Sequence, residues 1–407
     1  MQAPGADSRG RMTLALRAII AAAVVGLLCG GCAHDPNPVG AGVLPKSDTP
    51  GIQTDTLYPT LHSTGLGLIL TQNSDTRVYS WVVDRIMLGN TQNIEANAFL
   101  MFSSFPDTMI GVTITSAVVQ LKAAYTFGNP VGSVMFTAYR ALTTWREDSL
   151  TYDSLSRFPS TYYSPTPVSN LVSQSVQDSS WFQFSIDPGM VTDWFTTAID
   201  TGTINQGIIL RPMPGTVIKG FASFNAADPS AWPKLTVNYL RDGIPGVFTD
   251  TLGFAKYIAY ENPANLILDP KLMYVQEGIS YRAFMDFDLS HFPIPSSVHR
   301  AQLELTLDSA ASAFNLATRD SLFSFFVTDD GLISTGTASL SGRPSPSLYT
   351  FSVGTYVQSW EKGTLLRRIS IAGFAENNSF DRFVFYGENA PKPAWRPRLI
   401  ITHSPAQ

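Results

Sequence analysis

From residue 55 to residue 403 the chain alternates short apolar runs with turn residues. The runs at 118–121, 134–137 and 207–210 are rich in Val, Ile, Phe and Thr, and Gly, Pro, Asn and Asp separate such runs along the chain. No stretch keeps the 3.6-residue period of a helix over several turns. The pattern therefore predicts an all-β chain built from antiparallel β-sandwiches.

Four blocks of this pattern occur twice, in the same order. They lie at residues 98–102, 114–121, 184–194 and 232–235, and again at 283–287, 298–305, 351–360 and 395–399. The spacing between copies falls from 185 residues at Ala98/Ala283 to 164 at Leu235/Leu399, so the first copy carries an insertion. Two copies are too few for a solenoid, and each must close its own core. We predict two jelly-roll-like sandwiches, at 55–241 and 247–403, joined by residues 242–246.

The start of the chain is typical of a bacterial secretory signal. Three arginines within residues 9–17 precede an apolar stretch at 18–31, which is too short to span about 30 Å of hydrocarbon. The stretch ends in Cys29-Gly-Gly-Cys32, which resembles the lipobox of bacterial lipoproteins. Cys29 stands where that family usually has Leu. An ordinary cleaved signal with incidental cysteines is the alternative, and a start at Met1 or at Met12 stays open.

The lipobox resemblance implies a signal peptide at 1–31 and acylation of Cys32, the new N-terminus. Several acyl chains anchor a protein firmly where one alone is marginal. Ala33 is not the Asp that retains many lipoproteins at the inner membrane, which favours the outer membrane and leaves its face open. Pro and Gly are frequent in residues 32–54 and no periodic pattern appears there, so we predict a flexible tether.

The ordered motifs of both copies resemble the DNRLRE-type, or disaggregatase-related, β-sandwich found in carbohydrate-binding modules. The first copy carries the Trp-x-Glu block, the Val-x-x-Trp element and the closing Pro-x-Leu strand at Trp145-Arg-Glu147, Val191-Thr-Asp-Trp194 and Pro233-Lys-Leu235. The second copy keeps Val357-Gln-Ser-Trp360 and Pro397-Arg-Leu399 but lacks the Trp-x-Glu block. The resemblance implies non-catalytic modules that bind polysaccharide or cell-envelope glycan.

Four residues of the first copy are candidates for carbohydrate binding: Trp145, Glu147, Tyr162 and Tyr163. The two tyrosines lie in the inserted segment, and long loops often carry function. An aromatic ring offers a flat apolar face to a sugar, and tyrosine adds a hydroxyl. The alternatives are a structural corner for Trp145 and a solvated loop with one tyrosine turned inward. Trp194 and Trp360 are expected to plug the ends of their sandwiches.

Composition and short motifs exclude several classes of function. The chain has 27 Lys+Arg against 32 Asp+Glu, a net charge of -5, which argues against nucleic acid as a partner. Ser359 and Lys362 match the S-x-x-K of acyl enzymes, but the companion motifs are missing. The five histidines are scattered along the chain and both cysteines lie near its start, so neither type shows the spacing of a metal site. Calcium is possible in such sandwiches, but the sequence has no EF-hand pattern to support it. We predict no enzyme and no cofactor, and keep a structural or adhesion lipoprotein with protein partners as the alternative.

Lipidation is directly testable on the protein extracted from membranes. Its intact mass should correspond to a chain that begins at Cys32 and carries acyl chains, with no free thiol because Cys29 leaves with the signal peptide. An unmodified N-terminus in that mass spectrum would contradict the prediction.

Overall fold

The computed structural model describes residues 51–61, 84–102, 109, 111–143, 145, 150, 152–201, 205–261, 269, 271–279, 281–313, 315, 321–341, 347–374, 376 and 378–405. Outside these residues lie Cys32, Glu147, the predicted signal peptide and most of the predicted tether. Within them the chain is mainly antiparallel β-sheet that curls into a sandwich-like fold, which confirms the predicted all-β class. No helix in the described part is long and apolar enough to cross a membrane.

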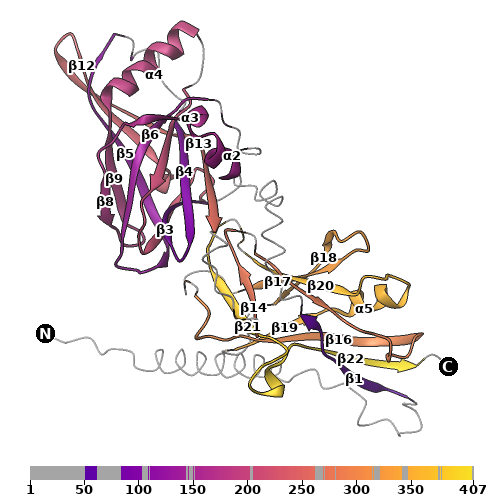
Figure 1. The fold of residues 1–407 in the computed structure, drawn as a ribbon. Coiled ribbons are helices and arrows are strands. Elements are labelled where there is room, and N and C mark those ends of the chain that lie inside the picture. Colours follow the sequence, from indigo (N-terminus) through magenta and orange to yellow (C-terminus); the bar gives the residue numbers. More distant parts are fainter. Residues whose placement is uncertain are drawn as a thin grey trace, which may run out of the picture. The chain divides into compact units, whose positions relative to one another are not determined.

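One curled sheet, called here the first sandwich, contains the strands of the first copy (Figure 1). In spatial order its strands are β13 (Ile244–Glu261), β12 (Lys234–Arg241), β5 (Thr113–Gly128), β11 (Val217–Ala222), β3 (Arg85–Thr91), β4 (Ile94–Phe102), β10 (Ile208–Pro212), β6 (Ser133–Ala141) and β7 (Tyr163–Pro167). Two short strands pair beside this path, β8 (Val172–Ser175) with β6 and β9 (Trp181–Ile186) with β5. Because β13 pairs with both β12 and β4, the sheet closes on itself.

The second sandwich is built from three smaller sheets. Four strands form one of them, β1 (Gln53–Leu57), β22 (Arg398–Pro405), β16 (Ser296–Thr306) and β19 (Leu348–Ser352). Five form the next, β18 (Ile333–Ser341), β17 (Leu322–Val327), β20 (Arg368–Gly373), β15 (Ala283–Asp286) and β2 (Thr60–Leu61), and β14 (Leu272–Gln276) pairs with β21 (Arg382–Tyr386).

Few helices interrupt these strands. They are α2 (Tyr152–Arg157), α3 (Pro159–Tyr162), α4 (Pro188–Thr201), α5 (Gly354–Glu361) and the 3-10 turns η4 (Pro229–Ala231) and η6 (Pro393–Trp395). Trp194 on α4 and Trp360 on α5 are 3% and 1% exposed and lie in the two main cores. Their predicted burial in the cores is confirmed, and their position as end plugs stays a prediction.

The repeated sequence blocks occupy matching positions in the two sandwiches. In the first, β5 lies between β12 and β9; in the second, β16 lies between β22 and β19. The helices α4 and α5 follow the matching strands β9 and β19, and η4 and η6 precede the matching strands β12 and β22. The sequence repeat is therefore also a repeat of strand pairing.

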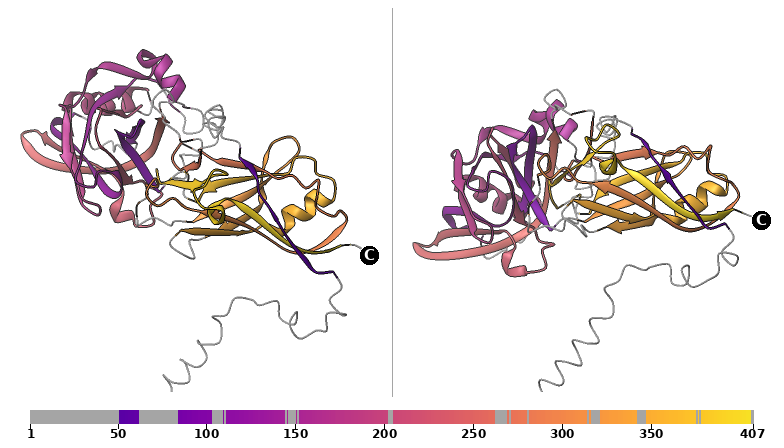
Figure 2. Two further views of the ribbon diagram at one scale, coloured as in Figure 1. Left: turned by 60° about the horizontal axis from the view of Figure 1, so that its bottom comes forward. Right: turned by 90° about the horizontal axis from the view of Figure 1, so that it is seen from below.

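The leading strands of the copies are exchanged, which differs from the predicted boundaries at 55 and 247. Strand β1 pairs with β22 and β2 with β15, so residues 53–61 complete the second sandwich. Strand β13 pairs with β12 and β4 and completes the first. In Figures 1 and 2 the indigo β1 lies beside the yellow β22. Residues 54–57 and 249–252 both read Thr-Asp-Thr-Leu, which marks β1 and β13 as equivalent strands.

The predicted linker at 242–246 is also different in the structure. Asp242 and Gly243 form the two-residue turn of the β12–β13 hairpin, with φ angles of 49° and 80°. Two successive positive φ angles match the twist of a tight hairpin, and Asp-Gly is a preferred pair for them. Gln53–Gln407 forms one compact unit, and the division into two independently folding domains stays a prediction.

A buried polar contact joins the two sandwiches at Tyr125 on β5. Its hydroxyl donates to Asp381 Oδ1 at 2.8 Å and accepts from the Phe380 amide at 2.9 Å. Asp381 Oδ1 also accepts a hydrogen bond from the backbone N–H of Asn315 at 3.1 Å. Phe380 is fully buried, and its ring lies 6.2 Å from that of Phe127. This contact inserts residues of the second sandwich into the core of the first.

Removing the Tyr125 hydroxyl should destabilise the fold. Tyr125→Phe takes a donor from Asp381 and an acceptor from the Phe380 amide, both buried, so we expect a loss of about 2 kcal/mol in the free energy of unfolding by urea. Tyr139→Phe is the control, because no hydrogen bond of its hydroxyl is found among the described residues and it should change stability by less than about 0.5 kcal/mol. Equal stability of both variants would contradict this role of Tyr125.

The same contact predicts a loss of stability at alkaline pH. Burial, and after it the charge of Asp381, raises the pKa of Tyr125 well above the usual 10.0. The unfolded tyrosine loses its proton above pH 10.0 while the folded one keeps it, so this contribution is complete below that pH and declines above it. Urea unfolding above pH 10.0 should therefore weaken wild type more than Tyr125→Phe, and parallel pH profiles would contradict the assignment.

Candidate functional site

Trp145, the first predicted binding residue, belongs to a small apolar core on the outer face of the first sandwich. Phe99 and Ile209 of β4 and β10 form its floor, because they alternate with residues that face the main core. Trp145 is 7% exposed, its ring centroid lies 5.5 Å from that of Phe99, and its indole N–H donates to the Gln206 carbonyl at 2.8 Å. A buried indole presents no face to a sugar, so Trp145 is a packing residue and its predicted binding role does not fit.

The two predicted tyrosines border the same small core. Tyr162 ends α3 and Tyr163 begins β7, and both are half-buried against it. The Tyr163 hydroxyl accepts a hydrogen bond from the guanidinium of Arg211, which also lies 3.4 Å from Glu95. Burial alone would lower the pKa of Arg211, but Tyr163 and Glu95 outweigh it and the pKa is raised. The structure thus brings Trp145, Tyr162 and Tyr163 together by packing, while Glu147 lies outside the described residues.

A polar cavity of about 260 Å³ lies elsewhere, beside the end of β5. Hydroxyl, amide and backbone groups dominate its lining, which consists of Thr91, Gln92, Thr126, Phe127, Gly128, Asn129, Thr216, Ala313 and Asn315. None of these side chains is ionisable. The described lining of the cavity therefore offers neutral hydrogen-bond donors and acceptors.

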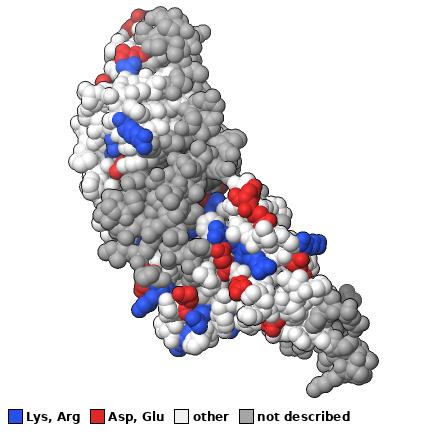
Figure 3. Space-filling model, turned by 45° about the vertical axis from the view of Figure 1, so that its right-hand side comes forward, with Lys and Arg blue, Asp and Glu red and all other residues white. Residues whose placement is uncertain are grey.

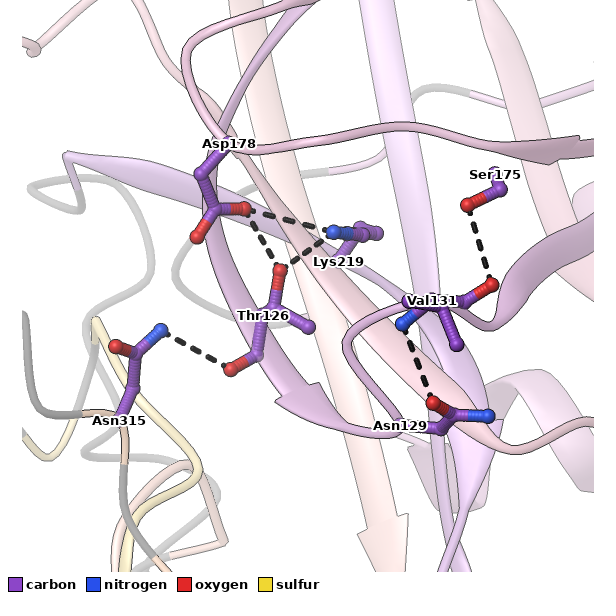
Figure 4. A network of polar contacts seen from close by, with 7 residues as sticks. All are labelled: Thr126, Asn129, Val131, Ser175, Asp178, Lys219 and Asn315. Carbon is purple, nitrogen blue, oxygen red and sulfur yellow. Dashed lines mark hydrogen bonds and ion pairs between the residues drawn. The ribbon is translucent and has the colours of Figure 1, made fainter.

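A buried lysine holds one wall of this cavity (Figure 4). Lys219 on β11 is 1% exposed, and its ammonium donates to the Thr126 hydroxyl at 2.5 Å and lies 3.5 Å from Asp178. The Thr126 hydroxyl in turn donates to Asp178 at 2.7 Å. On the other side, the Asn315 amide donates to the Thr126 carbonyl at 3.2 Å. Residue 126 is fixed from both sides, so its part of the cavity is preformed.

The turn after β5 shapes the rim of the cavity. Gly128 has a φ of 90°, and a Cβ there would lie 2.5 Å from the Thr216 carbonyl, so only glycine fits this close approach. The Asn129 side chain accepts from the Val131 amide at 3.2 Å, and the Val131 carbonyl accepts from Ser175 at 3.2 Å. These contacts hold the turn that carries Asn129.

Sequence reasoning missed a second feature, a half-exposed tryptophan that two lysines contact. The ammonium groups of Lys122 and Lys234 lie 5.4 Å and 5.2 Å from the ring centroid of Trp181. The alternation of β9 gave a signal for it, because Trp181 falls on the same face as the polar Gln183 and Ser185. Strand pairing, which the sequence pattern does not state, brings the lysines to it.

The described surface adds little other chemistry. On the face shown in Figure 3, basic and acidic side chains are interspersed and form no continuous basic field among the described residues. No group of three or more His, Cys, Asp or Glu within the described ranges is placed to hold a metal ion. The Ser359 hydroxyl donates to the Thr355 carbonyl within α5 at 2.9 Å, as expected of a helix-surface serine.

Comparison with known proteins gives no family. No family model matches the chain, and no curated protein matches it. Two solved structures of infectious bursal disease virus, one of the Gx strain and one of the VP2 subviral particle, are 8% and 9% identical and cover 88% of this chain, with 78% and 77% of their own chains covered. Both TM-scores are 0.11, too low to indicate a shared fold. The lipobox and DNRLRE resemblances stay predictions.

The packing role of Trp145 predicts a large effect on stability. Trp145→Ala removes a buried ring and a hydrogen bond, so we expect a loss of about 3–5 kcal/mol in the free energy of unfolding by urea. Trp181→Ala is the matched control and should cost about 1 kcal/mol, because this ring is half-exposed and the contacts that it loses include two cation–π contacts with lysines. If Trp145→Ala and Trp181→Ala had the same free energy of unfolding, the packing role of Trp145 would be contradicted.

Proposed function

We propose that this chain is a lipid-anchored, non-catalytic protein of the outer membrane that binds polysaccharide or cell-envelope glycan through its sandwiches. The signal at 1–31, the acceptor Cys32 and the tether at 32–54 support the anchor. The observation that carries the binding function is the neutral polar cavity beside β5.

The lining of the cavity suits a neutral sugar unit. Sugars present hydroxyl groups that both donate and accept, and the amide of Gln92 and the hydroxyl of Thr216 can do the same. A volume of about 260 Å³ is at the small end for ligand pockets, so the cavity fits one unit of a longer glycan. The fixed wall at Thr126 lowers the entropy lost on binding, because that group is already ordered.

A structural or adhesion lipoprotein that meets protein partners is the second candidate. The β12–β13 hairpin favours it, because Ile244 is 69% exposed and Val247 is 66% exposed near its tip. Residues 244–251 of β13 pair with β12 alone, and such an edge can add a strand from a partner.

Affinity electrophoresis of the detergent-extracted full chain against neutral polysaccharides tests the binding function. We expect retardation in at least one polysaccharide gel, and its loss in the Gln92→Asn/Thr216→Val variant, which removes cavity contacts while Asn tolerates the positive φ of residue 92. Thr113→Val, an exposed hydroxyl removed from the same strand that leads to the cavity, is the matched control and should migrate as wild type.

Two other outcomes would count against the proposal in different ways. Retardation that survives in the double variant keeps glycan binding and removes the cavity as its site. No retardation with any neutral or acidic polysaccharide contradicts the proposed function and favours protein partners.

A further inference from the structure

The outer face of the first sandwich carries a flat cationic and aromatic surface, named here the Trp181 platform. It consists of Lys122, Trp181 and Lys234, with Gln120 and Gln183 beside them. Lys122 pairs directly with Trp181 across β5 and β9, and Gln120 pairs with Gln183 two residues along the same strands. Lys234 on β12 pairs with Gln120 from the other side. Directly paired residues of antiparallel strands share a face, so all five form one surface.

Both lysines direct their charge to the same ring. The two ammonium groups lie 5.4 Å and 5.2 Å from the centroid of Trp181, within the range of cation–π attraction. Among the described residues no ion pair joins Lys122 or Lys234 to a carboxylate. Two like charges are thus gathered at one half-exposed indole, in a protein whose net charge is -5.

The second copy shows what this surface is like when its charge is neutralised. By the offsets of the repeat, Arg398 is the counterpart of Lys234 and Glu304 the counterpart of Gln120. Glu304 and Arg398 are paired across β16 and β22, and they form an ion pair with N and O atoms 2.7 Å apart. The first copy has glutamine where the second has that glutamate, and among the described residues the cation at the same position forms no ion pair.

The other two positions have diverged as well. Lys122 and Trp181 correspond to Thr306 and Leu348, which are also directly paired. The second copy therefore keeps the strands and their register but not the charge or the indole. The platform is a property of the first copy, added to a framework that folds without it.

One acidic group lies near the platform. The pKa of Asp228 is lowered mainly by hydrogen bonds from Ser230, and the positive charges of Lys122 and Lys234 lower it further. Both of its oxygens are occupied, since the Ser230 amide donates to one at 2.9 Å and the Ser230 hydroxyl to the other at 2.8 Å. Asp228 caps η4 and does not form an ion pair with either lysine.

We propose that the Trp181 platform binds an acidic polysaccharide, with a sugar carboxylate at Lys122 and Lys234 and the indole edge or face of Trp181 against the sugar ring. Lysine provides the charge, the indole an apolar surface, and Gln120 and Gln183 provide amides for sugar hydroxyls. A polymer with a carboxylate on every unit also raises the effective concentration of the next binding group. This inference rests on the proposed glycan-binding function and adds a second site, distinct from the neutral cavity.

Calorimetric titration of the detergent-extracted full chain with polygalacturonate and with its methyl ester tests the platform. The two polymers share their sugar and differ in the carboxylate charge, so wild type should bind polygalacturonate at least about tenfold more tightly. Gln120→Glu gives Lys234 the partner that Arg398 has, and it should weaken polygalacturonate binding at least about tenfold without disturbing the strands. Trp181→Ala and Lys122→Gln/Lys234→Gln should weaken it similarly.

Matched variants separate the site from general charge effects. Lys362→Gln/Lys392→Gln removes the same charge from exposed lysines of the second copy and should leave polygalacturonate binding within about twofold of wild type. Asp228→Asn keeps the cap and removes the nearby negative charge, so it should strengthen binding.

The inference is overturned if wild type binds the methyl ester as tightly as the acid, or if Gln120→Glu binds polygalacturonate as wild type does. In either case retardation by neutral polysaccharides would leave the proposed function standing. Absence of binding to every polysaccharide, neutral or acidic, would contradict both.

Discussion

Each sandwich is completed by a leading strand that the repeat assigns to the other. Residues 54–57 and 249–252 share the sequence Thr-Asp-Thr-Leu, yet β1 pairs with β22 of the second copy and β13 with β12 of the first. Without these strands, β22 and β12 would become sheet edges with unpaired backbone groups. The exchange therefore makes the closure of each sandwich depend on the presence of the other, and the buried Tyr125–Asp381 contact reinforces that dependence.

The exchange also decides which sandwich an anchor would hold. The predicted tether at 32–54 leads into β1, whose residues pair with β22 from Gln53↔His403 to Leu57↔Leu399. Asp55 adds an interaction with the buried His403 at 2.9 Å. Force applied through a lipid on Cys32 would therefore reach the C-terminal strand first, across a ladder of backbone hydrogen bonds. The Trp181 platform lies on β5, β9 and β12, outside that ladder.

The sequence contained the element types but not their partners. Apolar alternation is a local property, so it was sufficient to predict strands and the buried positions of Trp194 and Trp360. Strand pairing is set by contacts between residues far apart in the chain. For that reason the sequence alone predicts a linker at Asp242-Gly243, where the structure has a hairpin turn. The Thr-Asp-Thr-Leu repeat was the available signal for the exchange. Trp145 failed as a ligand residue because its burial depends on Phe99, which lies 46 positions before it.

Duplication gives this chain an internal comparison that a single domain lacks. Positions that both copies keep, such as Trp194 and Trp360 in the cores, are those that the sandwich needs in order to fold. Positions where one copy has an ion pair and the other has none, as at Arg398–Glu304 and Lys234–Gln120, are not needed for folding in the same form. The first copy has glutamine in place of Glu304, so the sandwich does not require this partly buried ion pair in order to form. This asymmetry between equivalent positions, more than exposure or charge alone, distinguishes the first sandwich from the second and is the basis of the proposal that Lys234 takes part in ligand binding.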